Sequence, residues 1–190
     1  MSATAIVVPV PEAEPVVQRW RQRCTDDGAE GMPAHITLLY PFADPGVVIP
    51  ERVGAVLRRF GPVKLTLTSA ARFAGTSTVL FLEPVPDAAF RAMTAALTGA
   101  FPQYQPYGGA FDDVVPHLTV AASADEDVLA RIERDVTRAL PIHARATQVW
   151  LMEHRDSRWR IHTRFPLGHR FAVPNSDFGV YAHKNRSSGS

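Results

Sequence analysis

A three-residue pattern, His-x-Thr, occurs twice in this sequence, and each copy has the same kind of surroundings. His35 and Thr37 form the first copy, and His117 and Thr119 form the second. Each copy lies in a short apolar segment, residues 34–40 or residues 114–121, that is predicted to be a strand. Because alternate side chains of a strand share one face, each copy places an imidazole beside a hydroxyl, with apolar residues behind them.

The segments around the two copies follow one another in the same order, which indicates two related halves. Each half, roughly residues 4–85 or 86–167, runs through a strand, a helix, the strand with the histidine, a second helix and a hairpin. If the halves pair about a pseudo-two-fold axis, the two polar faces lie opposite each other. Residues 1–167 are then expected to form a single bilobal domain, and residues 168–190 a partly disordered tail.

Hydrophobic periodicity predicts the individual elements. Apolar residues recur at helical spacing, which predicts helices over residues 15–24, 50–60, 87–101 and 125–140. Further strands are expected over residues 5–10, 63–73, 78–82, 142–153 and 159–166. The stretches 25–31 and 102–109 are polar or rich in glycine and proline, so they are expected to be loops.

Composition narrows the functions open to this chain. The formal net charge is +1, without the strong basic excess of proteins that grip long nucleic acids, so a short phosphate ligand is favoured. Cys24 is the only cysteine, which argues against a disulfide framework and a thiolate metal cluster. There is no basic leader segment, and no apolar run approaches the roughly 18 residues of a membrane span. A cytoplasmic protein without a membrane partner is expected.

Two opposed histidines and two threonines suit an in-line displacement at phosphorus. A neutral imidazole takes the proton of the attacking water or hydroxyl, while an imidazolium on the other side protonates the leaving oxygen. The unperturbed pKa of histidine, about 6.5, allows both forms near neutral pH. The threonine hydroxyls hydrogen-bond the non-bridging phosphate oxygens. We therefore assign His35, Thr37, His117 and Thr119 to catalysis, and this chemistry requires neither a metal nor another cofactor.

At these positions the sequence resembles the 2H phosphoesterase superfamily, which contains the RNA 2′,3′-cyclic phosphodiesterases also called 2′-5′ RNA ligases. The family is marked by two H-x-[TS] motifs with apolar flanks, matched here by residues 35–38 and 117–120. Residues 79–84 resemble the strand before the family's central helix. Residues 149–153 and 159–167 resemble its closing hairpin, so the likeness spans about residues 4–167.

This resemblance implies a fold, a reaction and a mode of action. The fold is α+β and bilobal, with two antiparallel sheets lining a central cleft and helices outside. The implied reaction opens 2′,3′-cyclic phosphates, or cleaves 2′-5′ phosphodiesters, at RNA termini or on small nucleotides. By analogy His117 is the base and His35 the acid, and the protein is expected to be a monomer.

Six further residues are candidates for substrate binding, each with a structural role as the alternative. The two aromatic residues after the first copy either line a groove and stack on a base or pack in the core. The three arginines, at the ends of hairpin strands, either contact phosphate or remain solvated. The tyrosine before the second copy is placed for a lid or a base platform. These candidates are Tyr40, Phe42, Arg72, Tyr107, Arg155 and Arg158.

Other interpretations of the same residues remain open. A non-catalytic module would sense a nucleotide in the same cleft, although binding alone needs no opposed acid and base. A metallohydrolase would need further histidines or carboxylates at ligand spacing, and EDTA-resistant turnover would exclude it. Cys24 lies in a predicted helix without a base partner, so a cysteine nucleophile is discounted. The remaining histidines are interpreted as structural or surface residues: His143, His154, His162, His169 and His183.

Overall fold

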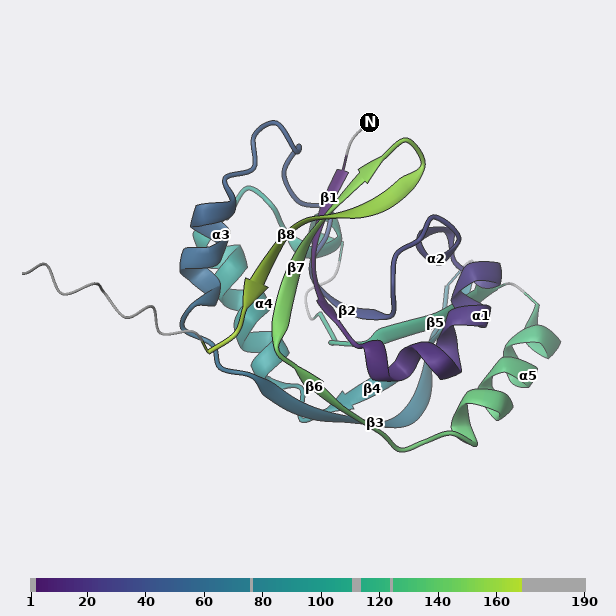
Figure 1. Ribbon diagram of the computed structural model, residues 1–190. Helices are drawn as coiled ribbons and strands as arrows, with labels where there is room; N and C mark the ends of the chain where they lie inside the picture. The colour runs from purple at the N-terminus through teal and green to yellow at the C-terminus, as the bar shows by residue number, and fades with distance from the viewer. Residues whose placement is uncertain (1–2, 76, 111–113, 124, 169–190) are drawn as a thin grey trace, which may run out of the picture.

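Two four-stranded sheets form the centre of the protein (Figure 1). The computed structural model describes residues 3–75, 77–110, 114–123 and 125–168. The first sheet, in the order β2-β1-β7-β8, contains β1 (Ala3–Pro9), β2 (His35–Leu39), β7 (Gln148–Arg155) and β8 (Arg158–Pro166). The second sheet, in the order β5-β4-β3-β6, contains β3 (Val63–Phe73), β4 (Thr78–Val85), β5 (Leu118–Ser123) and β6 (Ile142–Ala146). All paired strands are antiparallel, so the expected α+β class with two antiparallel sheets is confirmed.

The sheets do not correspond to the two halves of the sequence. Each sheet takes two strands from residues 4–85 and two from residues 86–167. The expected single strand over residues 142–153 is in fact two strands, because the chain leaves the second sheet after β6 and enters the first as β7. The two halves therefore contain similar elements in the same order, but strands of one half pair with strands of the other within each sheet.

Helices cover the outer faces of both sheets. The helices are α1 (Glu14–Cys24), α2 (Asp26–Ala29), α3 (Pro50–Leu57), α4 (Ala88–Ala100) and α5 (Glu126–Thr137), with 3-10 turns η1 (Pro11–Ala13) and η2 (Pro106–Gly109). Helices α3 and α4 pack on the first sheet, while α1 and α5 pack on the second (Figure 1). A large core fills the space between the sheets and these helices. A second, smaller cluster consists of Ala5, Val7, Met32 and Met152, with Trp159 packed against it.

The edge strands of the two sheets position the His-x-Thr copies. β2 ends the first sheet and β5 ends the second, and the two strands contact each other. On β2, Ile36 and Leu38 are fully or almost fully buried in the core, while Thr37 points the other way. Leu118 and Val120 do the same on β5. The alternation expected for both copies is therefore present, and both polar faces lie on the same side of the core.

Two local predictions need correction. Residues 25–31 are not only a loop, since Thr25 caps the short helix α2 by accepting a hydrogen bond from the Gly28 amide at 3.0 Å. The strand expected from residue 114 begins at Leu118, so His117 is the residue just before β5. The preceding Pro116 has no amide hydrogen with which to extend the ladder. The expected tail, apart from Gly168, lies outside the described residues.

The turn expected at residues 156–157 is confirmed in position. Asp156 and Ser157 have φ values of 52° and 54°, as a two-residue turn between twisted antiparallel strands requires. The turn sets the register of the β7–β8 hairpin, so His154 lies opposite Trp159.

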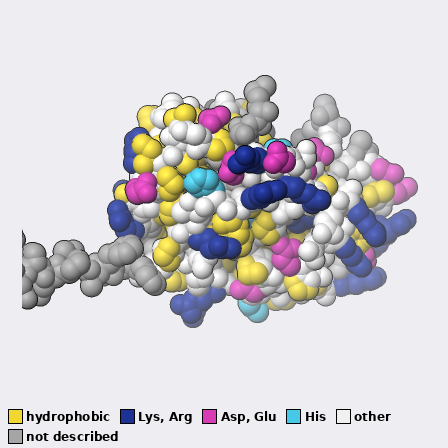
Figure 2. Space-filling model, turned by 45° about the horizontal axis from the view of Figure 1, so that its top comes forward, with side chains coloured by type: hydrophobic (Ala, Val, Ile, Leu, Met, Phe, Trp, Pro, Cys, Tyr) yellow, Lys and Arg dark blue, Asp and Glu magenta, His cyan; other side chains and the backbone are white. Residues whose placement is uncertain are grey.

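Basic and acidic side chains are interspersed on the face shown in Figure 2, in keeping with the small net charge.

Candidate functional site

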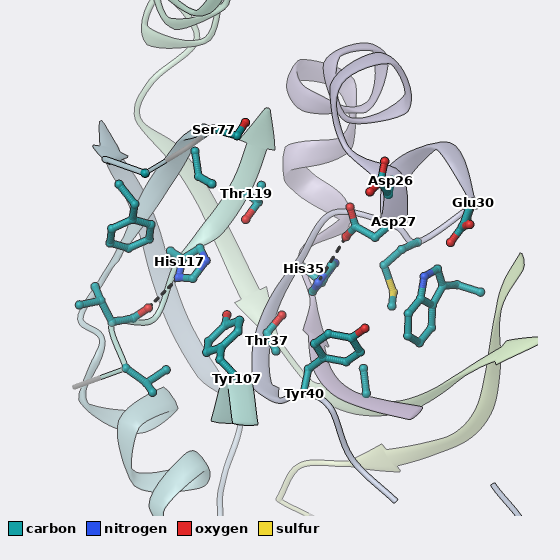
Figure 3. A pocket seen from close by; sticks show the side chains of 18 of the residues that line it. Asp26, Asp27, Glu30, His35, Thr37, Tyr40, Ser77, Tyr107, His117 and Thr119 are labelled. Atoms are coloured by element: carbon teal, nitrogen blue, oxygen red, sulfur yellow. Dashed lines mark hydrogen bonds and ion pairs between the residues drawn. The ribbon is translucent and has the colours of Figure 1, made fainter. Parts of the chain in front are cut away.

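A cavity of about 860 Å³ opens where the edges of the two sheets meet. His35 and Thr37 line it from β2, and His117 and Thr119 line it from the start of β5. In the view of Figure 3 the pair from β5 lies on the left and the pair from β2 in the centre. The two copies of the pattern therefore share one site, as the pseudo-two-fold arrangement predicts.

The two histidines are held by the same backbone contact. Nδ1 of His35 lies 2.7 Å from the carbonyl oxygen of Pro33, and Nδ1 of His117 lies 2.7 Å from that of Val115. A carbonyl oxygen only accepts, so Nδ1 carries the hydrogen in both rings. In the neutral ring Nε2 is then the nitrogen with the lone pair, ready to accept or, once protonated, to donate a proton.

His35 lies beside a carboxylate and a buried guanidinium. Its Nε2 is 3.9 Å from Oδ2 of Asp27 (Figure 3). Burial, and then the charge of Arg21, lower the pKa of His35 to about 4, although Asp27 acts in the opposite direction. The pKa of Asp27 is itself lowered, because the attraction of Arg21 and His35 outweighs the effect of burial. In the unliganded protein His35 is therefore neutral at pH 7.

Arg21 connects the two copies of the pattern. Its side chain is almost fully buried beneath the cavity, with 1% of the residue exposed. One guanidinium nitrogen donates to the carbonyl oxygen of Thr119, and the other donates to Oδ2 of Asp27, both at 2.7 Å. The second nitrogen also donates to the carbonyl oxygen of Met32 at 3.4 Å. A single residue of α1 thus fixes the backbone of β5 relative to the carboxylate next to His35.

His117 has an aromatic environment instead. Phe73 and Phe81 meet its ring edge-on, at centroid distances of 5.0 and 5.4 Å. Tyr107 lies nearly parallel to the ring at 6.4 Å. Burial lowers the pKa of His117, while the hydrogen bond to Val115 acts the other way. The two histidines are therefore held alike but have different electrostatic surroundings, because a carboxylate lies beside His35 and aromatic rings surround His117.

Tyr107 completes the wall between the two histidines. It adopts a left-handed conformation with φ of 52°, and its amide donates to the carbonyl oxygen of Tyr40 at 2.5 Å. Burial raises the pKa of the Tyr107 phenol, and a hydrogen bond with Thr37 opposes that shift. The phenol therefore stays protonated at neutral pH and lies beside Thr37 in the cavity wall.

The candidate binding residues separate into two groups. Tyr40, Arg72 and Tyr107 line the cavity. Arg72 also forms ion pairs with Glu126 and Glu133 of α5, so its charge is already balanced.

The other three candidates do not reach the cavity. Phe42 is 7% exposed, and its ring packs against Phe101 and Tyr104 in the core. Arg155 and Arg158 are exposed on either side of the hairpin turn, outside the cavity lining. The surface and core alternatives therefore describe these three residues better than contact with a ligand.

Sequence reasoning missed several residues of the cavity. Asp27 lies in a segment taken for a loop, and Glu30 follows it in the same segment. His154, interpreted as a structural or surface residue, lines the cavity together with Trp159. A signal for this pair existed, because a turn at residues 156–157 places positions 154 and 159 opposite each other. Nothing in the sequence brings that hairpin next to Glu30.

Within the part of the chain that the structure describes, no three His, Cys, Asp or Glu residues are grouped so as to hold a metal ion. None of the helices in those same residues has the length and apolar character needed to cross a membrane.

Comparison with known proteins identifies the family. The model of the 2′-5′ RNA ligase superfamily matches residues 8–158. No curated protein sequence matches the chain. The chain belongs to the 2′-5′ RNA ligase superfamily, as its two motifs and two antiparallel sheets lead one to expect.

Solved structures share the fold at low sequence identity. Escherichia coli LigT, crystallised with 3′-AMP, is 17% identical with a TM-score of 0.56, and the match covers 88% of this chain and 99% of LigT. A protein described as a phosphoesterase is 18% identical with a TM-score of 0.53, covering 89% and 100% of the two chains. TT0787 of Thermus thermophilus is 16% identical with a TM-score of 0.55, covering 88% and 99%.

Proposed function

We propose that this protein is a metal-independent phosphodiesterase that acts on 2′,3′-cyclic or 2′-5′-linked phosphodiesters of RNA ends or small nucleotides. One observation carries the proposal. Two histidines, each with Nδ1 bonded to the carbonyl two residues earlier, line a single cavity together with two threonines. Membership of a superfamily of phosphoesterases and ligases supports the same class of reaction. LigT has been crystallised with a nucleotide, 3′-AMP, which agrees with a nucleotide-sized substrate.

In the proposed reaction His117 is the base and His35 the acid. Water attacks phosphorus and gives its proton to Nε2 of His117, while the bond from phosphorus to the ribose oxygen breaks. Nε2 of His35 gives its proton to that oxygen, so each proton has a donor and an acceptor. Asp27 supports this direction, because its carboxylate lies 3.9 Å from Nε2 of His35 and favours the protonated ring.

Protonation of His35 accompanies substrate binding in this scheme. The pKa of His35 is about 4 in the free protein, which leaves the ring neutral at pH 7. A bound phosphodiester brings a negative charge close to the ring, and a nearby opposite charge raises the pKa of an imidazole. Thr37, Thr119 and the phenol of Tyr107 lie around the same space and donate to the non-bridging oxygens as charge builds up.

A panel of substrates tests the function. Purified protein is incubated in EDTA with 2′,3′-cyclic nucleotides, with short RNA ending in a cyclic phosphate, and with 2′-5′-linked dinucleotides. We expect at least one class to be converted, and chromatography against 2′- and 3′-phosphate standards identifies which oxygen leaves. Nucleotide binding without turnover on any substrate would support the non-catalytic module instead. Activity that EDTA removes would support a metallohydrolase.

A further inference from the structure

The cavity is much larger than a phosphate group, and one part of it differs in character from the catalytic centre. This part, here called the acidic lobe, adjoins His35 on the side away from His117, where Figure 3 shows Asp26, Glu30 and Tyr40. The acidic lobe is lined by Ala5, Asp26, Glu30, Met32, Tyr40, His154 and Trp159.

Charge decides which part of a nucleotide fits there. Asp27 is neutralised by Arg21, but Asp26 and Glu30 add negative charge to the lobe, and an anionic phosphate is repelled by carboxylates. A neutral group with N–H donors is attracted instead, because an ionised carboxylate only accepts hydrogen bonds. The phosphate therefore belongs at the histidines and the nucleoside in the acidic lobe.

The walls of the lobe suit a planar ring. Trp159 contacts two other rings, Tyr40 edge-on at a centroid distance of 6.1 Å and His154 in a tilted arrangement at 5.1 Å. Tyr40 follows β2 and Trp159 lies on β8, the opposite edge of the first sheet, and the small side chain of Ala5 on β1 lines the space between them. Aromatic side chains of this kind provide stacking surfaces for nucleobases.

Glu30 is held in place as a hydrogen-bond acceptor. Its carbonyl oxygen accepts from the Trp159 amide at 2.9 Å, which ties the loop after α2 to β8. Gly31 follows with φ of +91°, a backbone conformation that glycine adopts without strain. Oε2 of Glu30 lies at ion-pair distance, 2.9 Å, from Nε2 of His154, although the contact does not have the geometry of a hydrogen bond. The carboxylate is therefore placed at the cavity with its oxygens able to accept hydrogen bonds from a ligand.

We propose that the acidic lobe binds the nucleobase, and that Glu30 selects bases carrying an exocyclic amino group by accepting a hydrogen bond from it. This inference rests on the proposed phosphodiesterase function and names the substrate class for the same site. Uracil presents a keto oxygen where cytosine presents an amino group, so its oxygen faces the carboxylate and binds less well.

The test compares two substrates of nearly equal size and shape. The values of kcat/KM are measured for cytidine and uridine 2′,3′-cyclic phosphates with the wild-type protein. We expect a preference for cytidine of about tenfold, the usual effect of one good base contact. The variant Glu30→Gln replaces the carboxylate by an amide that also donates, so the preference should fall toward unity. Glu51→Gln, on the exposed face of α3, is the matched control and should keep the wild-type ratio.

A second pair of variants tests the stacking surface. Trp159→Ala should raise KM for both substrates about tenfold and leave kcat nearly unchanged, because a stacked ring contributes to binding rather than to proton transfer. Trp159→Phe keeps a planar ring and should recover most of the loss. A fall in kcat with KM unchanged would contradict a base-binding role for this wall.

The outcomes distinguish failure of this inference from failure of the proposed phosphodiesterase function. If wild-type protein opens both substrates with equal kcat/KM, or if Glu30→Gln leaves a cytidine preference intact, the role of Glu30 is wrong and the phosphodiesterase proposal survives. If the protein opens no cyclic nucleotide or RNA cyclic phosphate and cleaves no 2′-5′ diester, the proposed function fails and this inference fails with it.

Discussion

At the scale of single residues, the most informative difference is between His35 and His117. Both rings are fixed through Nδ1, yet only His35 has a carboxylate close to Nε2. Asp27 contacts no reacting atom in the proposed reaction, so its role is to position the proton on His35. The same aspartate also neutralises the buried Arg21. An experiment that removes the Asp27 carboxylate must therefore separate its structural effect from its electrostatic effect on His35.

We expect Asp27→Asn to lower kcat and to move the alkaline limb of the kcat–pH profile downward by about one unit, because a negative charge that favours protonated His35 is lost. A cyclic phosphate with sulfur at the leaving position separates this effect from a structural one, since a thiolate leaves without a proton. The variant should approach the wild-type rate on that substrate. Equal losses on both substrates would instead indicate general disruption of the site.

The sequence predicts the site's central residues but not their supports. The two copies of His-x-Thr lie in strands whose apolar and polar side chains alternate, so His35 and His117 are expected to lie in one site. The alternation determines which side chains share a face of each strand. Asp27, Glu30 and Trp159 reach the same cavity from separate segments, through contacts between residues far apart in the chain. Single-sequence patterns do not contain such long-range contacts.

At the scale of elements, helix α2 determines where Asp27 lies. The helix is only four residues long, and it packs against the end of α1 with very little space. A Cβ atom added at Gly28 would lie 2.6 Å from the backbone carbon and oxygen of Arg21. The close approach explains why a glycine follows Asp27, a detail that the sequence alone presents as an ordinary loop residue.

The variant Gly28→Ala should destabilise the protein by about 2 kcal/mol, because backbone of α1 rather than a movable side chain blocks the new methyl group. It should also lower kcat, since any shift of α2 moves Asp27. Gly99→Ala is the matched control, as nothing lies within 4 Å of a Cβ atom there and the position is helical. That variant should instead stabilise the protein by about 0.5–1 kcal/mol. Equal unfolding free energies in urea for the two variants would contradict the packing explanation.

At the scale of the whole molecule, the two sheets are assembled from both halves of the chain. The fold class and most helices follow from periodicity, whereas the crossing of residues 142–153 from one sheet to the other does not. Residues 142–146 alternate apolar and polar side chains, and residues 149–152 form a continuous apolar run. Both patterns are typical of strands, so periodicity alone does not mark the break between them. Their partners, β3 and β1, are far away in sequence, and only the packed core decides between them.

The stability of the whole molecule should depend on pH through the buried histidines. The pKa of His35 is about 4 in the folded protein against an ordinary value of 6.5, so the unfolded chain binds the extra proton between these two pH values. The contribution of His35 to the unfolding free energy is therefore complete above pH 6.5. It is lost as the pH drops toward 4, which lowers the unfolding free energy by about 3 kcal/mol. Urea unfolding between pH 7 and 4.5 measures the slope.

The variant His35→Gln should flatten that slope, while His143→Ala, at an exposed position away from the cavity, should keep it. His117, whose pKa is also lowered by burial, should account for part of the slope that remains. A slope unchanged in His35→Gln would mean that this ring is not neutralised by folding.

The central claim is that His35 and His117 act together on one phosphodiester. The most direct measurement is the rate of 2′,3′-cyclic phosphate opening in EDTA for the wild type, His35→Ala, His117→Ala, the double variant and the surface control His143→Ala. We expect each single variant to lose at least about a hundredfold in kcat and the double variant to lose little more, because an acid and a base of one step act as a unit. The control should match the wild type. Turnover in the double variant close to that of the wild type would contradict the claim.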